Sequence, residues 1–150
     1  IEKEITIPRL NVRSFIDAMV LKEGALYDIK TFNDYKWQSI FGRYGSKEAP
    51  QNYAIQLGTY GLYFKEKKTP IKKMSLLFYN KNNSRVKELL VPRTYIDVAE
   101  RYWTKVQELF KEGLPPVVKG LSPVEEWECN PKYCSFYEPC GGGIKETKQG

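Results

Sequence analysis

Two aspartates and a lysine have the types and spacing that a metal-dependent hydrolytic site requires. Asp17 lies in the apolar segment 15–20, where a carboxylate left unpaired in a core would cost several kcal/mol, so it needs a partner or a metal ion. Asp28 and Lys30 are two residues apart in the segment 27–31. In a strand they project from the same face, and a hairpin would bring that face beside Asp17.

These three side chains suit the hydrolysis of a phosphodiester. Two carboxylates, a backbone carbonyl and water would form the all-oxygen site that Mg²⁺ or Mn²⁺ prefers. The ion would stabilise developing negative charge and lower the pKa of an attacking water, while Lys30 polarises a phosphate oxygen or orients the water. An Asp-x-Lys tripeptide alone is common in proteins, and the alternative is a pair of solvated charges on a strand.

A second pair of polar side chains lies on a helix predicted over residues 51–65. Gln56 and Tyr60 are four residues apart and share one helix face, from which they could hydrogen-bond the lysine, the carboxylates or a nucleic-acid backbone. The alternative is that Tyr60 belongs to the apolar stripe of this helix. The other members of that stripe are Tyr53, Leu57 and Phe64.

Composition favours an anionic partner and excludes histidine chemistry. The 150 residues include 24 Lys or Arg and 18 Asp or Glu, a formal net charge of +6, and this surplus is typical of proteins that bind nucleic acid. The sequence contains 0 histidines, which excludes a Ser-His-Asp triad, a Cys-His pair and a histidine general base within it. Catalysis by these residues would use carboxylates, lysine, cysteine or a metal ion.

The elements that must position these residues predict an α/β protein with a mixed central β-sheet flanked by helices. We expect a domain over residues 1–118 and a cysteine-containing tail over residues 119–150. Hydrophobic spacing and turn residues predict the following elements. They are a hairpin of strands 12–21 and 25–31, an irregular or partly helical connector 33–50, a helix 51–65, a hairpin 74–79 and 85–91, and a helix 92–112.

A basic stretch, residues 65–73, follows the Gln56 helix directly. It holds five lysines and one glutamate. We expect it to lie beside the reacting edge and to contact DNA phosphates, in contacts that are sensitive to salt and blind to sequence. The alternative is an ordinary solvated surface. The lysines expected to bind DNA are Lys67, Lys68, Lys72 and Lys73.

The three cysteines of the sequence, Cys129, Cys134 and Cys140, all lie within twelve positions of the tail. Such a cluster indicates metal ligation in a reducing compartment. Zinc and iron–sulfur clusters both take four ligands, so a fourth would come from elsewhere. The alternatives are a disulfide with one free thiol, or three incidental cysteines.

Taken together, the segments FIDAMV (15–20), DIKT (28–31) and QLGTY (56–60) match a known set of motifs in order and spacing. They resemble the PD-(D/E)XK nucleases of the RecB type, especially the iron–sulfur exonucleases related to the CRISPR-adaptation nuclease and their phage or viral homologues. The resemblance covers residues 11–60 and resumes in the cysteine tail. It differs in three features: Ser14 stands where many relatives have glycine, relatives carry an upstream histidine, and their usual cysteine spacing is C-x2-C-x5-C, whereas this chain has C-x4-C-x5-C.

This resemblance implies a restriction-endonuclease-like core and a metal-dependent deoxyribonuclease, an exonuclease acting on single-stranded DNA or duplex ends. The implied metal ligands for Mg²⁺ or Mn²⁺ are Asp17, Asp28 and the carbonyl oxygen of Ile29. The implied catalytic set is Asp17, Asp28, Lys30, Gln56 and Tyr60. Because relatives have one cysteine upstream of the core and three at the end, an iron–sulfur cluster is favoured over zinc for the tail, and we expect residues to be missing before Ile1.

Two other functions remain as alternatives. One is a catalytically inactive nucleic-acid-binding or assembly subunit that retains the nuclease fold, against which the intact five-residue set argues. The other is a metal-dependent hydrolase of a non-nucleic substrate, which the basic composition disfavours. No apolar run is long enough to span a bilayer and no signal-peptide pattern is present, so we expect an intracellular, cytoplasmic protein (host cytoplasm if viral) with no membrane partner.

Overall fold

The computed structural model describes residues 2–113, 128 and 130–139, and it confirms an α/β protein with a mixed sheet. The chain divides into two units, Ile1–Glu100 and Arg101–Gly150, and every residue of the candidate site lies in the first. The expected boundary between residues 118 and 119 falls outside the described residues. Within the described ranges, no helix combines the length and the apolar character needed to cross a bilayer.

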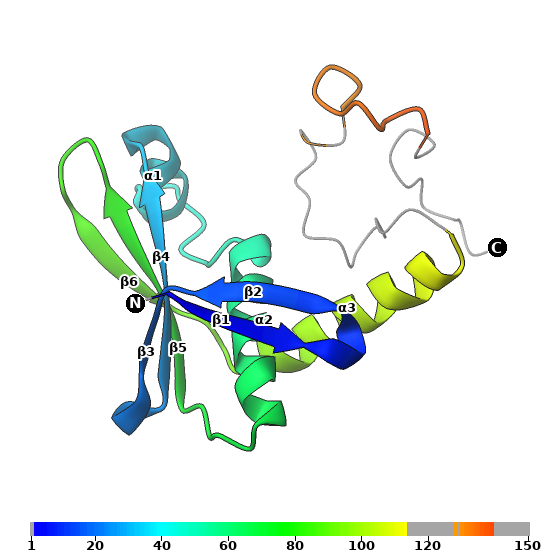
Figure 1. Cartoon of the computed structure of the whole chain (residues 1–150). Coiled ribbons are helices and arrows are strands. Elements are labelled where there is room, and N and C mark those ends of the chain that lie inside the picture. The colour runs from blue at the N-terminus through cyan, green and yellow to red at the C-terminus, as the bar shows by residue number, and fades with distance from the viewer. Residues whose placement is uncertain (1, 114–127, 129, 140–150) are drawn as a thin grey trace. The chain divides into compact units, whose positions relative to one another are not determined.

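Four strands form the central sheet, in the order β3-β4-β5-β6 (Figure 1). The middle pair is parallel and both outer pairs are antiparallel. A parallel pair needs a crossover connection, and here helices α1 and α2 supply it. The bounds are β3 Ala18–Val20, β4 Ala25–Phe32, α1 Asp34–Phe41, α2 Gln51–Glu66, β5 Lys73–Asn80 and β6 Val86–Leu90.

The single strand expected over residues 12–21 is wrong, because the chain bends at Asp17. Strand β2 (Val12–Ile16) pairs with β1 (Lys3–Ile7) in a separate two-stranded sheet, and the short 3₁₀ helix η1 (Pro8–Leu10) connects them. Only β3 pairs with β4, and the 3₁₀ helix η2 (Leu21–Glu23) follows it. Asp17 therefore lies at the junction of two sheets rather than within one strand.

Helix α2 covers one face of the sheet and packs against β4 and β5 (Figure 1). Its buried side chains are not confined to one stripe, because nearly every residue from Ala54 to Leu62 is buried. They include Ala54, Leu57, Tyr60 and Phe64. On the sheet, the buried core residues opposite include Leu26, Met74, Leu76 and Phe78.

Helix α3 (Tyr95–Lys111) begins against α2 at a position where α2 has no side chain. A Cβ atom added to Gly58 would lie 2.2 Å from the carbonyl oxygen of Tyr95. This is backbone, which cannot move aside as a flexible side chain can. The close approach of the two chain segments therefore requires a glycine at position 58. This position lies midway between Gln56 and Tyr60 along the sequence.

Gly58→Ala should lower the free energy of unfolding by about 1–3 kcal/mol, because overpacking outweighs the gain of about 1 kcal/mol in helix propensity. Gly61→Ala is the matched control, since a Cβ atom there would meet the side chains of Ile96 and Met74, which can shift. Urea unfolding of both variants compares the two losses. Equal losses, or a gain for Gly58→Ala, would contradict the close approach.

Candidate active site

Strand β4 presents Asp28 and Lys30 to the face of the sheet that α2 covers. Alternate residues of a strand point to opposite faces, so Asp28, 1% exposed, points inward while Ile29, 52% exposed, points to the other face. The Nζ atom of Lys30 lies 2.9 Å from Oδ2 of Asp28. The lysine side chain is itself only 20% exposed. The strand thus carries a largely buried ion pair between two residues that the sequence places two positions apart.

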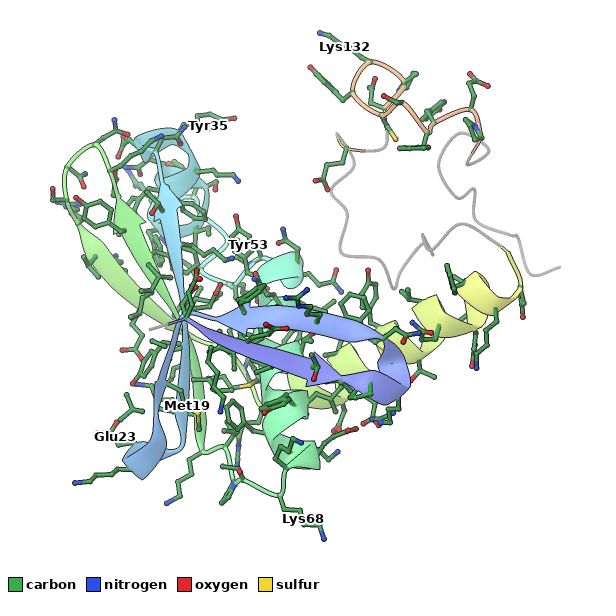
Figure 2. All side chains as sticks on the ribbon, viewed as in Figure 1. Met19, Glu23, Tyr35, Tyr53, Lys68 and Lys132 are labelled. Atoms are coloured by element: carbon green, nitrogen blue, oxygen red, sulfur yellow. The ribbon has the colours of Figure 1, made fainter. Side chains whose placement is uncertain are left out.

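Helix α2 holds this lysine in a chain of hydrogen bonds. Lys30 Nζ donates to Oε1 of Gln56 at 2.7 Å, and Nε2 of Gln56 donates to Oη of Tyr60 at 2.8 Å. The ring of Tyr53, labelled in Figure 2, has its centroid 4.7 Å from Lys30 Nζ. Tyr60 is 1% exposed, so it is both a core residue and a member of this polar chain.

Asp17 and the backbone of Ile29 meet at the edge where β3 ends. Oδ2 of Asp17 accepts a hydrogen bond from the Ile29 amide nitrogen at 2.9 Å. The β3–β4 pairing ends at Ala18↔Tyr27, so this contact lies just beyond it. Because the N–H and C=O of one strand residue point to the same side, the Ile29 carbonyl also points towards this edge. The three groups proposed as metal ligands are therefore brought to one region.

The electrostatics of Asp28 set it apart from an ordinary surface carboxylate. Burial raises the pKa of Asp28 from 3.8 to about 6; the positive charge of Lys30 opposes this rise and the neighbouring Asp17 adds to it. Within the described residues, Oδ2 of Asp28 is buried with the Lys30 ion pair but without a partner in hydrogen-bond geometry. The described residues alone therefore provide too few favourable contacts for the buried negative charge of Asp28.

These donors fit a Mg²⁺ or Mn²⁺ ion. The described residues contain no group of three or more His, Cys, Asp or Glu side chains placed to hold a metal, so the chain offers two carboxylates and one carbonyl. Mg²⁺ is commonly held by one or two carboxylates, with water and substrate phosphate completing its shell. Zinc prefers nitrogen and sulfur ligands, and no described His or Cys side chain joins these donors. A divalent cation would supply the charge compensation that Asp28 lacks.

The expected lysines lie at the other end of α2 from Gln56, so the prediction that they flank the reacting edge is wrong. Eleven residues of helix, from Gln56 to Lys67, span about 16 Å. Lys73 begins β5 opposite Ala25, whereas Lys30 pairs with Phe78. Lys73 also already has an ion-pair partner, because its Nζ lies 2.5 Å from Oε1 of Glu88. A role in DNA binding stays a prediction for Lys67, Lys68, Lys72 and Lys73.

The cysteine tail contributes little to the geometry described. Cys129 and Cys140 lie outside the described residues, and Cys134 is a free, partly buried cysteine within them. The metal centre expected in the tail therefore stays a prediction.

Two side chains join the site that the sequence argument did not include. Tyr53 was assigned to the apolar stripe, although it is three residues before Gln56 and seven before Tyr60, on their face. Burial raises the pKa of Tyr60, and a hydrogen bond with Ser14 of β2 opposes that rise. Helical spacing could have found Tyr53. Ser14 depends on the bend at Asp17, which has no local signal.

Comparison with known proteins leaves the family open. No family model matches the sequence, and no curated protein matches it. A solved structure described as "Crystal structure of SSO0001" is similar over 97% of this chain, with 18% sequence identity and a TM-score of 0.46. This chain spans 59% of the length of that protein.

The raised pKa of Asp28 makes the metal-free protein less stable as pH rises. The protonated carboxyl contributes stability that is present below pH 3.8 and is lost as pH rises through about 6. Asp28→Asn removes this loss, so at pH 8 without metal it should be more stable than wild type, by up to about 3 kcal/mol. The difference should become small at pH 4, as urea unfolding at both values would show.

Two controls make this stability test specific. Asp97→Asn changes an aspartate whose side chain is 69% exposed, and it should not reproduce the gain. Adding Mn²⁺ at pH 8 should raise the melting temperature of wild type but not of Asp28→Asn, since a ligand stabilises only the protein that binds it. A less stable Asp28→Asn at pH 8, or equal stabilisation of both proteins by Mn²⁺, would contradict the assignment.

Proposed function

We propose that this protein is a metal-dependent deoxyribonuclease, an exonuclease that hydrolyses phosphodiester bonds of DNA. The observation that carries the proposal is the buried, under-compensated Asp28 carboxylate, next to Asp17 and paired with Lys30. The chain of contacts from Lys30 through Gln56 to Tyr60 supports it, because these are the residues by which the sequence resembles the PD-(D/E)XK nucleases. The formal net charge of +6 supports a nucleic acid rather than a neutral or cationic substrate.

Each residue of the site has a separate role in this proposal. Asp17, Asp28 and the Ile29 carbonyl would hold Mg²⁺ or Mn²⁺. When bound, the ion would stabilise charge on the phosphate and lower the pKa of a water nucleophile. Lys30 would place its ammonium group on a phosphate oxygen, where negative charge grows during the reaction.

The supporting residues fix the position of Lys30. Because Nε2 of Gln56 donates to Tyr60, the amide is oriented with Oε1 towards Lys30 Nζ. The ring of Tyr53 adds a cation–π contact on the same ammonium group. A lysine held in this way loses little freedom when substrate binds, so its charge is positioned before the reaction starts.

Purified protein with Mn²⁺ should degrade linear DNA, and chelation by EDTA should stop the reaction. Lys30→Ala and Asp28→Ala should each lower the cleavage rate by about 100-fold or more, because a charged group that stabilises the transition state is removed. Lys36→Ala, an exposed lysine on α1, is the matched control and should cleave at the wild-type rate. Release of labelled nucleotides measures the rate.

The outcome also separates the alternatives. Near-normal cleavage by either variant, with folding verified by circular dichroism, would refute the proposed catalytic set. A wild-type protein that binds DNA but does not cleave it with Mg²⁺ or Mn²⁺ would instead support the inactive nucleic-acid-binding or assembly subunit.

We further propose that Cys129, Cys134 and Cys140 bind a metal centre, an iron–sulfur cluster in preference to zinc. Three cysteines within twelve positions support ligation. Protein purified without oxygen should show broad visible absorption together with iron and sulfide; colourless protein with stoichiometric zinc would identify a zinc site. Cys134→Ser should lower the melting temperature, because metal ligation contributes folding energy. Metal-free protein with three titratable thiols would refute the proposal.

A further inference from the structure

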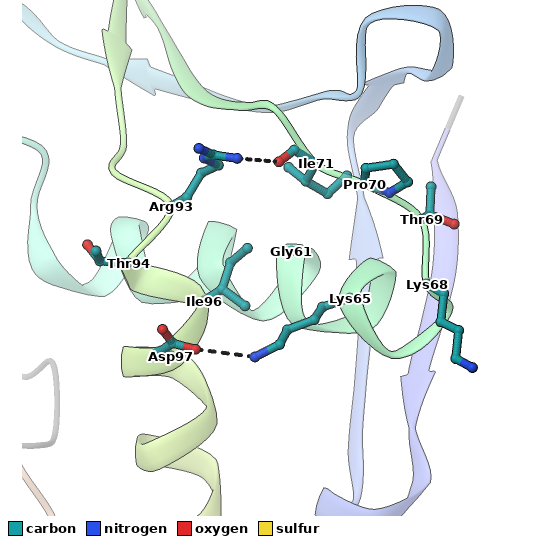
Figure 3. Close-up of a pocket in the computed structure, with 10 residues that line it drawn as sticks. All are labelled: Gly61, Lys65, Lys68, Thr69, Pro70, Ile71, Arg93, Thr94, Ile96 and Asp97. Carbon is teal, nitrogen blue, oxygen red and sulfur yellow. Dashed lines mark hydrogen bonds and ion pairs between the residues drawn. The ribbon is translucent and has the colours of Figure 1, made fainter.

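A pocket of about 540 Å³ opens between α2, the segment that follows it and the start of α3 (Figure 3). Its floor is largely apolar and includes Pro70, Ile71 and Ile96. Its rim carries basic and hydroxyl side chains, namely Lys65, Lys68, Arg93, Thr69 and Thr94, with Asp97 as the one acidic residue among those lining it. An apolar floor with a basic rim is the chemistry that a nucleotide requires, with an apolar surface for the base and cations for the phosphate.

The charges of the rim are only partly compensated. Lys65 Nζ lies 3.3 Å from Oδ1 of Asp97, so this lysine already has a counter-charge. Arg93 is held by a 3.3 Å hydrogen bond from Nη1 to the carbonyl oxygen of Ile71, and it has no acidic partner within ion-pair distance in the described part of the chain (Figure 3). Among the described residues, the Lys68 ammonium has no acidic partner within ion-pair distance. Two cations therefore remain available to an anion.

The backbone at Lys68 is one that favours glycine. Its φ is 56°, in the left-handed region, where a side chain is disfavoured. The amide of Thr69 donates to the carbonyl of Phe64 at 2.9 Å, the bond that closes a helix whose C-terminal residue is usually glycine. A lysine at this position costs stability and has no partner within the described chain. Asn11, Lys47 and Ser84 have a similar backbone conformation, so the cost at Lys68 supports ligand contact only together with its place on the rim of the pocket.

A second hollow continues the basic surface. It is lined by Lys72, Lys73 and Arg93, so Arg93 is common to both hollows. In this second hollow Lys73 is paired with Glu88, and Lys72 has no acidic partner within ion-pair distance among the described residues. The available cations thus run from Lys68 through Arg93 to Lys72. A row of cations suits a chain of phosphates better than a single one.

We propose that this pocket holds a stretch of DNA single strand outside the cleavage site, with one phosphate on Arg93, another phosphate on Lys68 at the opposite end of the pocket, and a base on Ile71 and Ile96. The inference rests on the proposed nuclease function and deepens it by naming a strand-holding subsite. Nine residues of helix separate Gln56 from Lys65, about 14 Å. A strand of several nucleotides can cover that distance, so one substrate could occupy both places.

Binding of fluorescein-labelled poly(dT), measured in EDTA as a function of salt concentration, tests this subsite without cleavage. For single strands, each phosphate contact contributes about 0.7 to the slope of log affinity against log salt. Lys68→Gly and Arg93→Gln should therefore each lower the slope by about 0.7, and the double variant by about 1.4. Lys68→Gly suits its backbone, so its melting temperature should be unchanged or raised, which excludes unfolding as the cause of weaker binding.

Lys81→Ala is the matched control, an exposed lysine in the turn after β5, at the opposite end of that strand from Lys72 and Lys73. Its slope should equal that of wild type. Absence of wild-type binding, or a slope unchanged in Lys68→Gly and Arg93→Gln, would overturn the subsite. If these variants lose stabilisation by dTMP yet keep the poly(dT) slope, the pocket holds a free nucleotide and the strand assignment is wrong. Because EDTA prevents metal-dependent cleavage, failure of the nuclease assay and failure of this test are distinguishable.

Discussion

The burial of one carboxylate under helix α2 organises the first unit of this protein. Asp28 is placed in the core face of β4, where the low dielectric raises its pKa to about 6. Such a group requires compensation, and the chain supplies it only in part, through the ammonium of Lys30. Lys30 in turn requires partners and finds them on α2, in Gln56 and Tyr53. The contacts that hold α2 on the sheet therefore include the polar contacts of the site.

The bend at Asp17 gives the site its remaining carboxylate. If residues 12–21 formed one continuous strand, β2 would continue along β4 and the Ile29 amide would take an ordinary ladder hydrogen bond. Instead β2 leaves to pair with β1, and the Asp17 carboxylate occupies the position next to the freed amide. Ser14 of β2 reaches Tyr60 by the same departure. Because β2 pairs with β1 and not with β4, the edge of β4 at Ile29 is free to accept the Asp17 carboxylate, and Ser14 lies close enough to contact Tyr60.

Positive charge is distributed between two regions that differ in burial. Lys30 is largely enclosed and committed to partners within the chain, which suits a group that must hold one position. Lys68 and Lys72 are exposed beyond the C-terminal end of α2 and Arg93 is exposed just before α3, and all three line hollows. Exposed cations of this kind attract a polyanion over a distance but are screened by salt. The two regions suit the two tasks proposed for them, precise positioning of a charge at one and retention of a strand at the other.

The sequence by itself determined helix α2, the hairpin of β5 and β6 and the approximate bounds of α3, but not strand β1 or the division of residues 12–21 into two strands. The periodicity of residues 51–65, the turn before β6 and the two-residue spacing of Asp28 and Lys30 are local properties, and each has its counterpart in the structure. Only the tertiary structure decided that Asp17 is a bend, that Ser14 and Tyr53 join the site, and that the lysines of residues 65–73 lie away from it. These depend on which strand β2 pairs with and on the direction in which α2 crosses the sheet. Both are fixed by long-range packing, which leaves no signal within a short segment.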